Sequence, residues 1–371
     1  MIVAGEASGD MHGASLVREM LKIDPSLNFY GIGGGKLQEA GVKLLANASE
    51  MAVVGLTEVI SRLGSFLRIM NRMKKSLDDC KPDLVILIDY PDFNLPLARA
   101  ACKRGIKVFY YISPQVWAWR KSRIGQIKKN VTAMAVILPF EVDTYGREGF
   151  RVDYVGHPLL DLVKTIYSPQ QARREFALKG EDTVIGLLPG SRSSEVVQLL
   201  PEMLRAAEII AKNIPQAKFV LPLADTLEKK IITGMISGFS VEVNVITGRT
   251  YDVISCADLA IVASGTATLE TALLGVPMII VYKISPLSYF IGKIAIRVKN
   301  IGLVNIIAGK TIVPELIQDQ ANGAHIAGEA LEILTNPLRK QEIIKELAGI
   351  RARLGNPGAA LRAAKLACDM I

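Results

Sequence analysis

Cysteine and histidine are scarce in this chain of 371 residues, which has four cysteines and three histidines. The cysteines are far apart and form no Cys-x-x-Cys pair: Cys80, Cys102, Cys256 and Cys368. We therefore expect no metal site built from cysteine and histidine, and we expect the cysteines to be small core residues in a reducing compartment. Asp-x-Asp is also absent, which argues against a carboxylate-held metal that bridges two phosphates. Neither a metal nor a cofactor is predicted.

Long hydrophobic runs are missing as well. Apolar stretches such as residues 272–282 are too short to span a bilayer. No signal peptide is recognisable before the first expected strand. The sequence lacks a Gly-x-Gly-x-x-Gly motif there, so a dinucleotide site is not expected. The expectation is a cytoplasmic protein that rests on a membrane without crossing it.

Acidic residues are missing from two long stretches of an otherwise mixed chain, which carries 44 basic and 36 acidic residues. Residues 93–140 and residues 271–314 contain lysines and arginines but no aspartate or glutamate. Such zones favour a phosphate-bearing ligand, nucleic acid or an anionic membrane, although solvated helix faces give the same pattern. Aromatic residues do not interleave with the basic ones in a known nucleic-acid-binding motif, so no nucleic acid is expected.

Short apolar runs bounded by Gly, Pro and Asp alternate with helical patterns along the chain. They lie at residues 1–5, 28–34, 84–89, 107–113, 133–140, 183–191, 218–223, 243–248, 259–264 and 277–282. This alternation predicts an α/β protein with two doubly wound parallel-sheet domains that face each other across a cleft. The expected domains are 1–160 and 161–336. Helices over 337–371 are expected to pack back on the first domain or on a partner chain.

Two loops in the second half have the composition of a nucleotide site. Ligands of doubly wound sheets bind in the loops that follow the strands. Gly190, Ser191 and Arg192 follow one expected strand and offer backbone amides, a helix start and a cation, which suit a diphosphate. A plain turn with a capping serine and a surface arginine has the same composition.

The second loop repeats this logic. Ser264, Gly265 and Thr266 lead from a strand into a helix, and Glu270 lies one turn further on. Its carboxylate could bind both hydroxyls of a ribose, or it could close a capping box at the helix start. In the first half, Asp89 ends the apolar run 84–88, where it could act as a general base or as a helix cap.

Residues 56–75 predict a basic amphipathic helix. The apolar stripe contains Leu63, Phe66, Leu67 and Met70, and the basic residues outside it include Arg68 and Arg72. These six residues are predicted to form a surface for a membrane or for acyl chains, with core packing as the alternative. Residues 285–307 are similarly apolar and basic.

Seven short motifs together resemble one family. They are AGEASGD, GLTEV, IDYPDFN, SPQVWAWR, LPGSR, ASGTATLE and VNIIAG, which run in this order between residues 4 and 309. The sequence is similar in these motifs to the lipid-A-disaccharide synthases. SPQVWAWR holds both tryptophans and is the most specific motif, whereas LPGSR and SGTATLE occur in many nucleotide-sugar glycosyltransferases. The chain begins almost inside its first expected strand, a departure from the family that removes no motif.

The resemblance implies the GT-B fold, with the donor nucleotide bound mainly by the second domain. It implies transfer of 2,3-diacylglucosamine from UDP to the 6-hydroxyl of 2,3-diacylglucosamine 1-phosphate, with inversion. The product is the β-1,6-linked disaccharide of lipid A. The implied partners are these two lipid-linked substrates and the cytoplasmic face of the inner membrane, and no metal takes part. A homodimer is also compatible with the C-terminal helices.

Residue by residue, the resemblance implies Asp89 as the base and Arg192 near the diphosphate. It implies Glu270 at the ribose and Asn305 as a further donor-side residue. Because the nucleotide loops lie in the second half, residues 5–12 are predicted to line the acceptor and donor-sugar side. The candidates there are Glu6, Ser8, Gly9, Asp10 and His12, although Ser8 and Asp10 could instead cap the first helix.

Three alternatives remain open. One is another N-acetylglucosaminyltransferase of the same fold, and a second is a UDP-sugar 2-epimerase; the tryptophan-rich motif argues against both. The third is a nucleotide-sensing module that binds membranes without catalysis.

Overall fold

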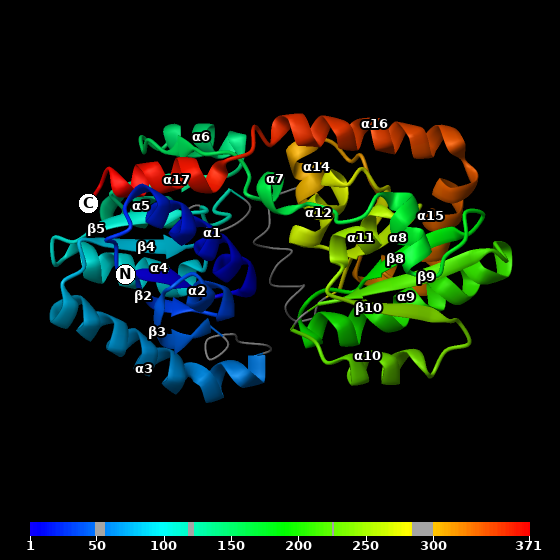
Figure 1. Ribbon diagram of the computed structural model, residues 1–371, viewed down its shortest axis with the longest axis horizontal. Coiled ribbons are helices and arrows are strands. Elements are labelled where there is room, and N and C mark those ends of the chain that lie inside the picture. The colour runs from blue at the N-terminus through cyan, green and yellow to red at the C-terminus, as the bar shows by residue number, and fades with distance from the viewer. Residues whose placement is uncertain (49–55, 118–121, 225, 284–299) are drawn as a thin grey trace. The chain divides into compact units, whose positions relative to one another are not determined.

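The computed structural model describes residues 1–48, 56–117, 122–224, 226–283 and 300–371, with the backbone alone over 56–63 (Figure 1). The chain forms two compact units. The first unit contains Met1–Asp161 and Leu354–Ile371, and the second contains Leu162–Arg353.

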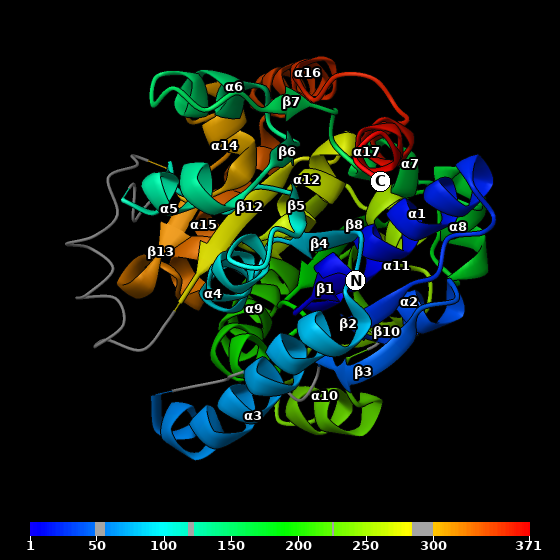
Figure 2. The same ribbon diagram turned by 90° about the vertical axis from the view of Figure 1, so that its left-hand side faces the viewer.

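The first unit is built on a parallel sheet of seven strands in the order β3-β2-β1-β4-β5-β6-β7 (Figure 2). Its strands are β1 (Ile2–Ala4), β2 (Tyr30–Gly33), β3 (Lys43–Asn47), β4 (Leu84–Ile88), β5 (Lys107–Tyr111), β6 (Ala133–Val136) and β7 (Asp153–Tyr154). The central strand β4 is buried along its whole length, as expected when helices cover both faces of a parallel sheet.

The helices of the first unit follow these strands, except for the C-terminal helix, which returns to this unit from the second. They are α1 (Ala7–Ile23), α2 (Gly35–Glu39), α3 (Leu56–Cys80), α4 (Pro91–Cys102), α5 (Arg123–Asn130), α6 (Pro139–Gly146) and α17 (Ala359–Cys368), with α7 (Leu159–Leu162) at the border of the unit. The core lies between the sheet and α3, α4 and α5, and includes Met73, Phe93 and Tyr110.

The second unit repeats the plan with six parallel strands in the order β10-β9-β8-β11-β12-β13. The strands are β8 (Thr183–Leu188), β9 (Ala217–Leu223), β10 (Val243–Thr247), β11 (Leu259–Ala263), β12 (Met278–Tyr282) and β13 (Glu315–Ile317). Its helices are α8 (Pro169–Glu175), α9 (Ser193–Asn213), α10 (Lys229–Ile236), α11 (Thr250–Ser255), α12 (Thr266–Leu273), α14 (Leu303–Ala308), α15 (Gly323–Thr335) and α16 (Pro337–Arg353). The prediction of two parallel-sheet α/β domains is confirmed.

The C-terminal helices divide between the units, whereas the sequence grouped them as one segment, 337–371. Helix α16 buries Ile343, Leu347 and Ile350 within the second unit, next to α12 and α14. Helix α17 packs on α1 of the first unit, as the figure shows at the red end of the chain (Figure 1). The buried face of α17 consists of alanines, which allow two helices to approach closely.

Candidate active site

The two predicted nucleotide loops follow neighbouring strands of the second unit. Strands β8 and β11 are neighbours in the sheet, with Leu188 opposite Val262, and the strand order diverges from this pair. Such a switch point is where doubly wound sheets bind ligands, because the loops on its two sides leave a crevice. Residues 190–192 follow β8 and residues 264–266 follow β11. Both loops therefore lie at the carboxyl ends of adjacent strands.

The loop after β8 is shaped around an anion. Gly190 has φ +111°, and a Cβ atom there would lie 2.3 Å from Oε2 of Glu195. The amides of Ser191 and Arg192 donate to this oxygen at 3.2 and 3.4 Å. The Arg192 guanidinium contacts the other carboxylate oxygen at 3.2 Å. The loop thus directs two amides and a cation at the carboxylate of Glu195, a residue that was not predicted from the sequence.

Glu270 is held by a partner that the sequence reasoning also missed. The hydroxyl of Tyr251, on α11, donates to Oε1 of Glu270 at 3.1 Å. Burial raises the pKa of Glu270, and the Tyr251 hydrogen bond opposes this rise. Glu270 lies beyond the first turn of α12, whose N-cap is Gly265, so the capping-box alternative is wrong. The structure therefore leaves the second carboxylate oxygen as the candidate ligand contact.

Asn305 has a structural role in place of the predicted donor contact. It is fully buried on α14. Its Nδ2 donates to the Val313 carbonyl at 2.9 Å and to Glu315 at 2.7 Å. Its Oδ1 accepts from the amides of Ile312 and Val313 at 2.8 and 3.1 Å. Both hydrogens and both lone pairs of the amide are used within the unit, so Asn305 positions the segment before β13.

The first unit has its own switch point, between β1 and β4. The loops there are residues 5–6 after β1 and residues 89–90 after β4. They touch, since a Cβ atom on Gly5 would lie 2.4 Å from the Tyr90 ring. Burial, followed by the charges of Glu6 and Asp92, raises the pKa of Tyr90. The structure therefore brings the loop that carries Glu6 against the loop that carries Asp89.

Asp89 lies in a strained turn that neighbouring side chains hold in place. Asp89 and Tyr90 both have φ +43°, which is unfavourable for residues other than glycine. The Asp89 carbonyl accepts hydrogen bonds from Nδ2 of Asn94 at 2.7 Å and from the Tyr110 hydroxyl at 2.5 Å. Beside this turn, Ile112 after β5 has φ +67°. Clustered strain of this kind is typical of functional sites, and Asn94 and Tyr110 are the residues that maintain it.

The AGEASGD motif is mostly helical, because α1 begins at Ala7. Asp10 is buried and accepts hydrogen bonds from the amides of Gly34, Lys36 and Leu37. It therefore caps α2, which corrects both the sugar-contact prediction and the alternative of a cap on the first helix. Gly9 packs against Ala4 and Ile88.

His12 is buried too, and its Nδ1 has no hydrogen-bond partner among the described residues. Burial lowers the pKa of His12 to about 4. Nearby, burial and the charge of His12 lower the pKa of His157 to about 3. Glu6 and Ser8 alone among the five candidates are partly exposed.

Two of the six residues of the predicted membrane surface on α3, Phe66 and Met70, belong to the core. Met70 is 4% exposed, and Phe66 packs edge-on against Phe93 with ring centroids 5.3 Å apart. Leu67 is exposed, as are Arg68 and Arg72. The side chain of Leu63 and most of the apolar segment 285–307 lie outside the described residues. The core-packing alternative therefore holds for Phe66 and Met70.

The SPQVWAWR motif begins at a buried anchor. Ser113 is within 2.7 Å of the Tyr145 hydroxyl, and the Trp117 indole donates to Glu141 at 3.3 Å. Trp117 also packs edge-on against Phe140. Burial raises the pKa of Glu141 to about 7. The loop after β5 is thus fixed to α6, and its remaining residues, 118–121, lie outside the described part of the chain.

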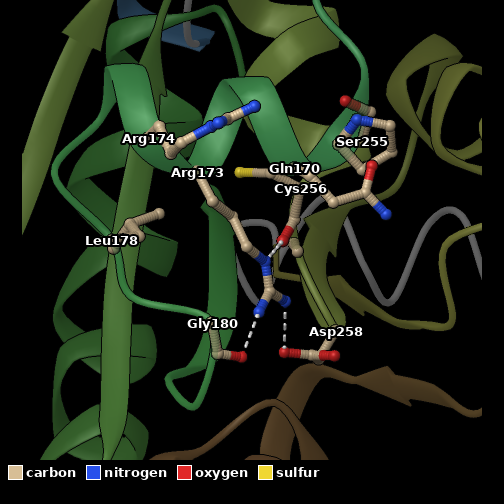
Figure 3. A pocket seen from close by; sticks show the side chains of 10 residues that line it. Gln170, Arg173, Arg174, Leu178, Gly180, Ser255, Cys256 and Asp258 are labelled. Carbon is tan, nitrogen blue, oxygen red and sulfur yellow. Dashed lines mark hydrogen bonds and ion pairs between the residues drawn. The ribbon is translucent and has the colours of Figure 1, made fainter.

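A pocket at the amino ends of β8 and β11 has a structural explanation. Figure 3 shows Arg173 at its centre, with hydrogen bonds to the carbonyls of Gly180 and Cys256 and an ion pair to Asp258. This arginine joins α8 to the strand starts at the edge opposite the nucleotide loops. Among the described residues, no three acidic, histidine or cysteine side chains gather as a metal site. No described helix has the length and hydropathy needed to cross a bilayer.

Comparison with known proteins shows the family and the fold of this chain. Residues 1–367 match the family model for lipid-A-disaccharide synthetase. The lipid-A-disaccharide synthase of Syntrophus aciditrophicus is 57% identical over 372 residues, which cover 100% of this chain and 97% of the relative. UDP-GlcNAc 2-epimerase from Neisseria meningitidis, solved bound to UDP-GlcNAc, aligns with a TM-score of 0.65 and 15% identity, covering 98% and 96% of the two chains.

The glycotransferase of kitacinnamycin aligns with a TM-score of 0.65 and 14% identity, covering 100% of this chain and 97% of the other. These structural likenesses show the GT-B fold, which epimerases and glycosyltransferases share. The sequence likeness is far closer and extends over the whole chain. The chain belongs to the lipid-A-disaccharide synthetase family.

Proposed function

We propose that this protein joins UDP-2,3-diacylglucosamine to 2,3-diacylglucosamine 1-phosphate, and that it releases the β-1,6-linked lipid A disaccharide and UDP. Family membership over residues 1–367 supports the reaction. The site is assigned to the switch point between β8 and β11, because both of these neighbouring strands are followed by a nucleotide-type loop. Solved relatives of this fold include an epimerase bound to UDP-GlcNAc.

The second unit binds the donor in this proposal. The amides of residues 190–192 and the Arg192 guanidinium stabilise the diphosphate charge, which grows as UDP leaves. Ser264, Gly265 and Thr266 contribute the facing loop at the start of α12. Glu270, oriented by Tyr251, accepts hydrogen bonds from the ribose hydroxyls. UDP is a good leaving group once its charge is met, so no separate acid is needed.

The first unit supplies the base and the acceptor contacts. Asp89 takes the proton from the acceptor 6-hydroxyl as this oxygen attacks the anomeric carbon opposite the departing UDP, which inverts the configuration. The strained turn at Asp89, fixed by Asn94 and Tyr110, supports this role. Glu6 and Ser8 are the partly exposed residues proposed to bind sugar hydroxyls on the adjoining loop.

Both substrates carry acyl chains, so we also propose that the protein works at the cytoplasmic face of the inner membrane. The support is the exposed part of α3 that contains Leu67, 50% exposed, together with the exposed Arg68 and Arg72. We also propose a homodimer, which the exposed Leu338 and Ile344 on α16 support.

The proposal is tested with purified protein in detergent without added metal. UDP should be released only when both the UDP-linked donor and the 1-phosphate acceptor are present, and a disaccharide should appear in equal amount. A UDP-sugar 2-epimerase would convert the donor without an acceptor. A nucleotide-sensing module would bind UDP and release none from the donor. Either of these two results contradicts the proposal.

A further inference from the structure

The carboxylate of Glu195 occupies the position where the donor diphosphate is expected. Its Oε2 accepts from the amides of Ser191 and Arg192 at 3.2 and 3.4 Å. Its Oε1 contacts the Arg192 guanidinium at 3.2 Å. These are the same amides and the same cation that are proposed to bind the diphosphate.

The loop fits this carboxylate closely. Only a glycine at position 190 allows the approach, because a Cβ atom would lie 2.3 Å from Oε2 and 2.9 Å from the Glu195 Cβ. The start of the 21-residue helix α9 adds its positive end to the same place. Tyr282, at the end of β12, is close enough to feel the charges of Glu195 and Arg192. Burial, and after it the charge of Glu195, raise the pKa of Tyr282, whereas Arg192 lowers it.

The carboxylate is able to leave. The Glu195 side chain is 30% exposed and that of Arg192 is 55% exposed, so water can replace the contacts between them. The hydrogen bonds to the amides are long for bonds to a charged acceptor. A diphosphate carries more charge and more acceptor oxygens than one carboxylate, and it can compete for the same donors.

We propose that Glu195 is a resident anion of the nucleotide loop, which a diphosphate displaces when it binds and which returns when UDP leaves. Glu195 is then a specificity-determining residue, because only ligands with a phosphate group exchange with its carboxylate. It also lowers the affinity for the product and favours its release. The inference rests on the nucleotide site proposed above.

Calorimetric titration of the full chain with UDP and with uridine tests this exchange. Glu195→Gln keeps the length of the side chain and removes its charge, and Glu195→Asp keeps the charge but is too short to reach the amides. Both variants should bind UDP about fivefold more tightly than the wild type, the effect of removing a competing exposed ion pair of about 1 kcal/mol. Uridine affinity should not change.

The control is Glu208→Gln, which removes a charge from the same helix at a carboxylate that bonds Ser240. Its UDP affinity should equal that of the wild type. If Glu195 only repels the ligand through its charge, Glu195→Asp will bind like the wild type. If Glu195 only caps α9, Glu195→Asp will bind more weakly. Either result overturns the inference.

The fold of each variant is checked by thermal unfolding without ligand. Absence of UDP binding by the wild type would contradict the proposed function, and the inference would fall with it. UDP binding by the wild type, with no gain in either Glu195 variant, would overturn the inference alone.

Discussion

Replacing Asn305 should lower the stability of the second unit, because its side chain bonds the protein and not a ligand. Asn305→Ala removes the acceptor of the Ile312 and Val313 amides, together with the donor to Val313 and Glu315. Val313 is 1% exposed, so water cannot replace these bonds without opening the structure. With about 1–3 kcal/mol for each buried group left unsatisfied, the expected loss is about 3–5 kcal/mol in the free energy of unfolding.

Urea unfolding followed by circular dichroism measures this loss. Both tryptophans of the chain lie before residue 162, so their fluorescence reports the first unit and serves as an internal control. Asn305→Asp should be destabilised too, because its new oxygen takes the place of Nδ2, 2.7 Å from Glu315. Two buried carboxylates in contact raise each other's pKa, so the deficit should shrink as the pH falls and a proton is shared. Unchanged stability of Asn305→Ala with lost UDP binding would refute the structural role.

Three further results are expected. Burial lowers the pKa of His12 from 6.5 to about 4, so this histidine stabilises the fold above pH 6.5 and loses about 2 kcal/mol of that contribution by pH 5. Between pH 7 and pH 5, the free energy of unfolding of His12→Gln, measured with urea, should therefore fall by about 2 kcal/mol less than that of the wild type. An equal fall in both proteins would contradict a His12 that is buried in its neutral form. Tyr251→Phe removes a hydrogen bond that lowers the pKa of Glu270, so UDP binding should weaken about threefold to tenfold. As the pH is lowered, UDP binding to this variant should be lost at a higher pH than in the wild type, because Glu270 is protonated earlier. The same pH dependence in both proteins, measured by calorimetry, would contradict this role of Tyr251. Gly190→Ala, at φ +111°, adds a Cβ atom 2.3 Å from Oε2 of Glu195 and should lower the free energy of unfolding by more than Gly275→Ala, which has φ +71° and open space and should cost only about 1–2 kcal/mol; equal losses in the two variants, measured by urea unfolding, would contradict the close fit of the loop.

The sequence was sufficient to predict the central strands and one edge strand, β10, but not the other three edge strands. The continuous apolar runs correspond to strands buried on both faces, such as β4 and β11. The strands that the pattern missed are β3, β7 and β13, and all three lie at sheet edges. Edge strands are short and partly polar, because one side has no neighbour and little apolar surface to bury.

The site was predicted where it depends on sheet topology. Loops after strands carry ligands in this architecture, so residues 190–192, 264–266 and Asp89 could be selected from the sequence. The errors concern side chains that bind distant backbone. Asp10 bonds the amide of Gly34, 24 positions away, and Asn305 bonds the segment before β13. A polar residue in a motif does not reveal whether its partner is a ligand or the protein itself.

Turnover and UDP affinity, measured together on Asp89→Asn, test whether Asp89 is the base of a reaction whose nucleotide is bound by the second unit. The disaccharide-forming rate should fall at least about a hundredfold, the usual contribution of a general base. The dissociation constant for UDP should stay within about twofold, since binding is proposed to depend on the second unit. Asp92→Asn, three residues further on in the first turn of α4 and paired with Arg123, is the matched control and should retain its rate. A variant at Asp89 that keeps its rate, or that loses UDP binding together with it, would contradict the account.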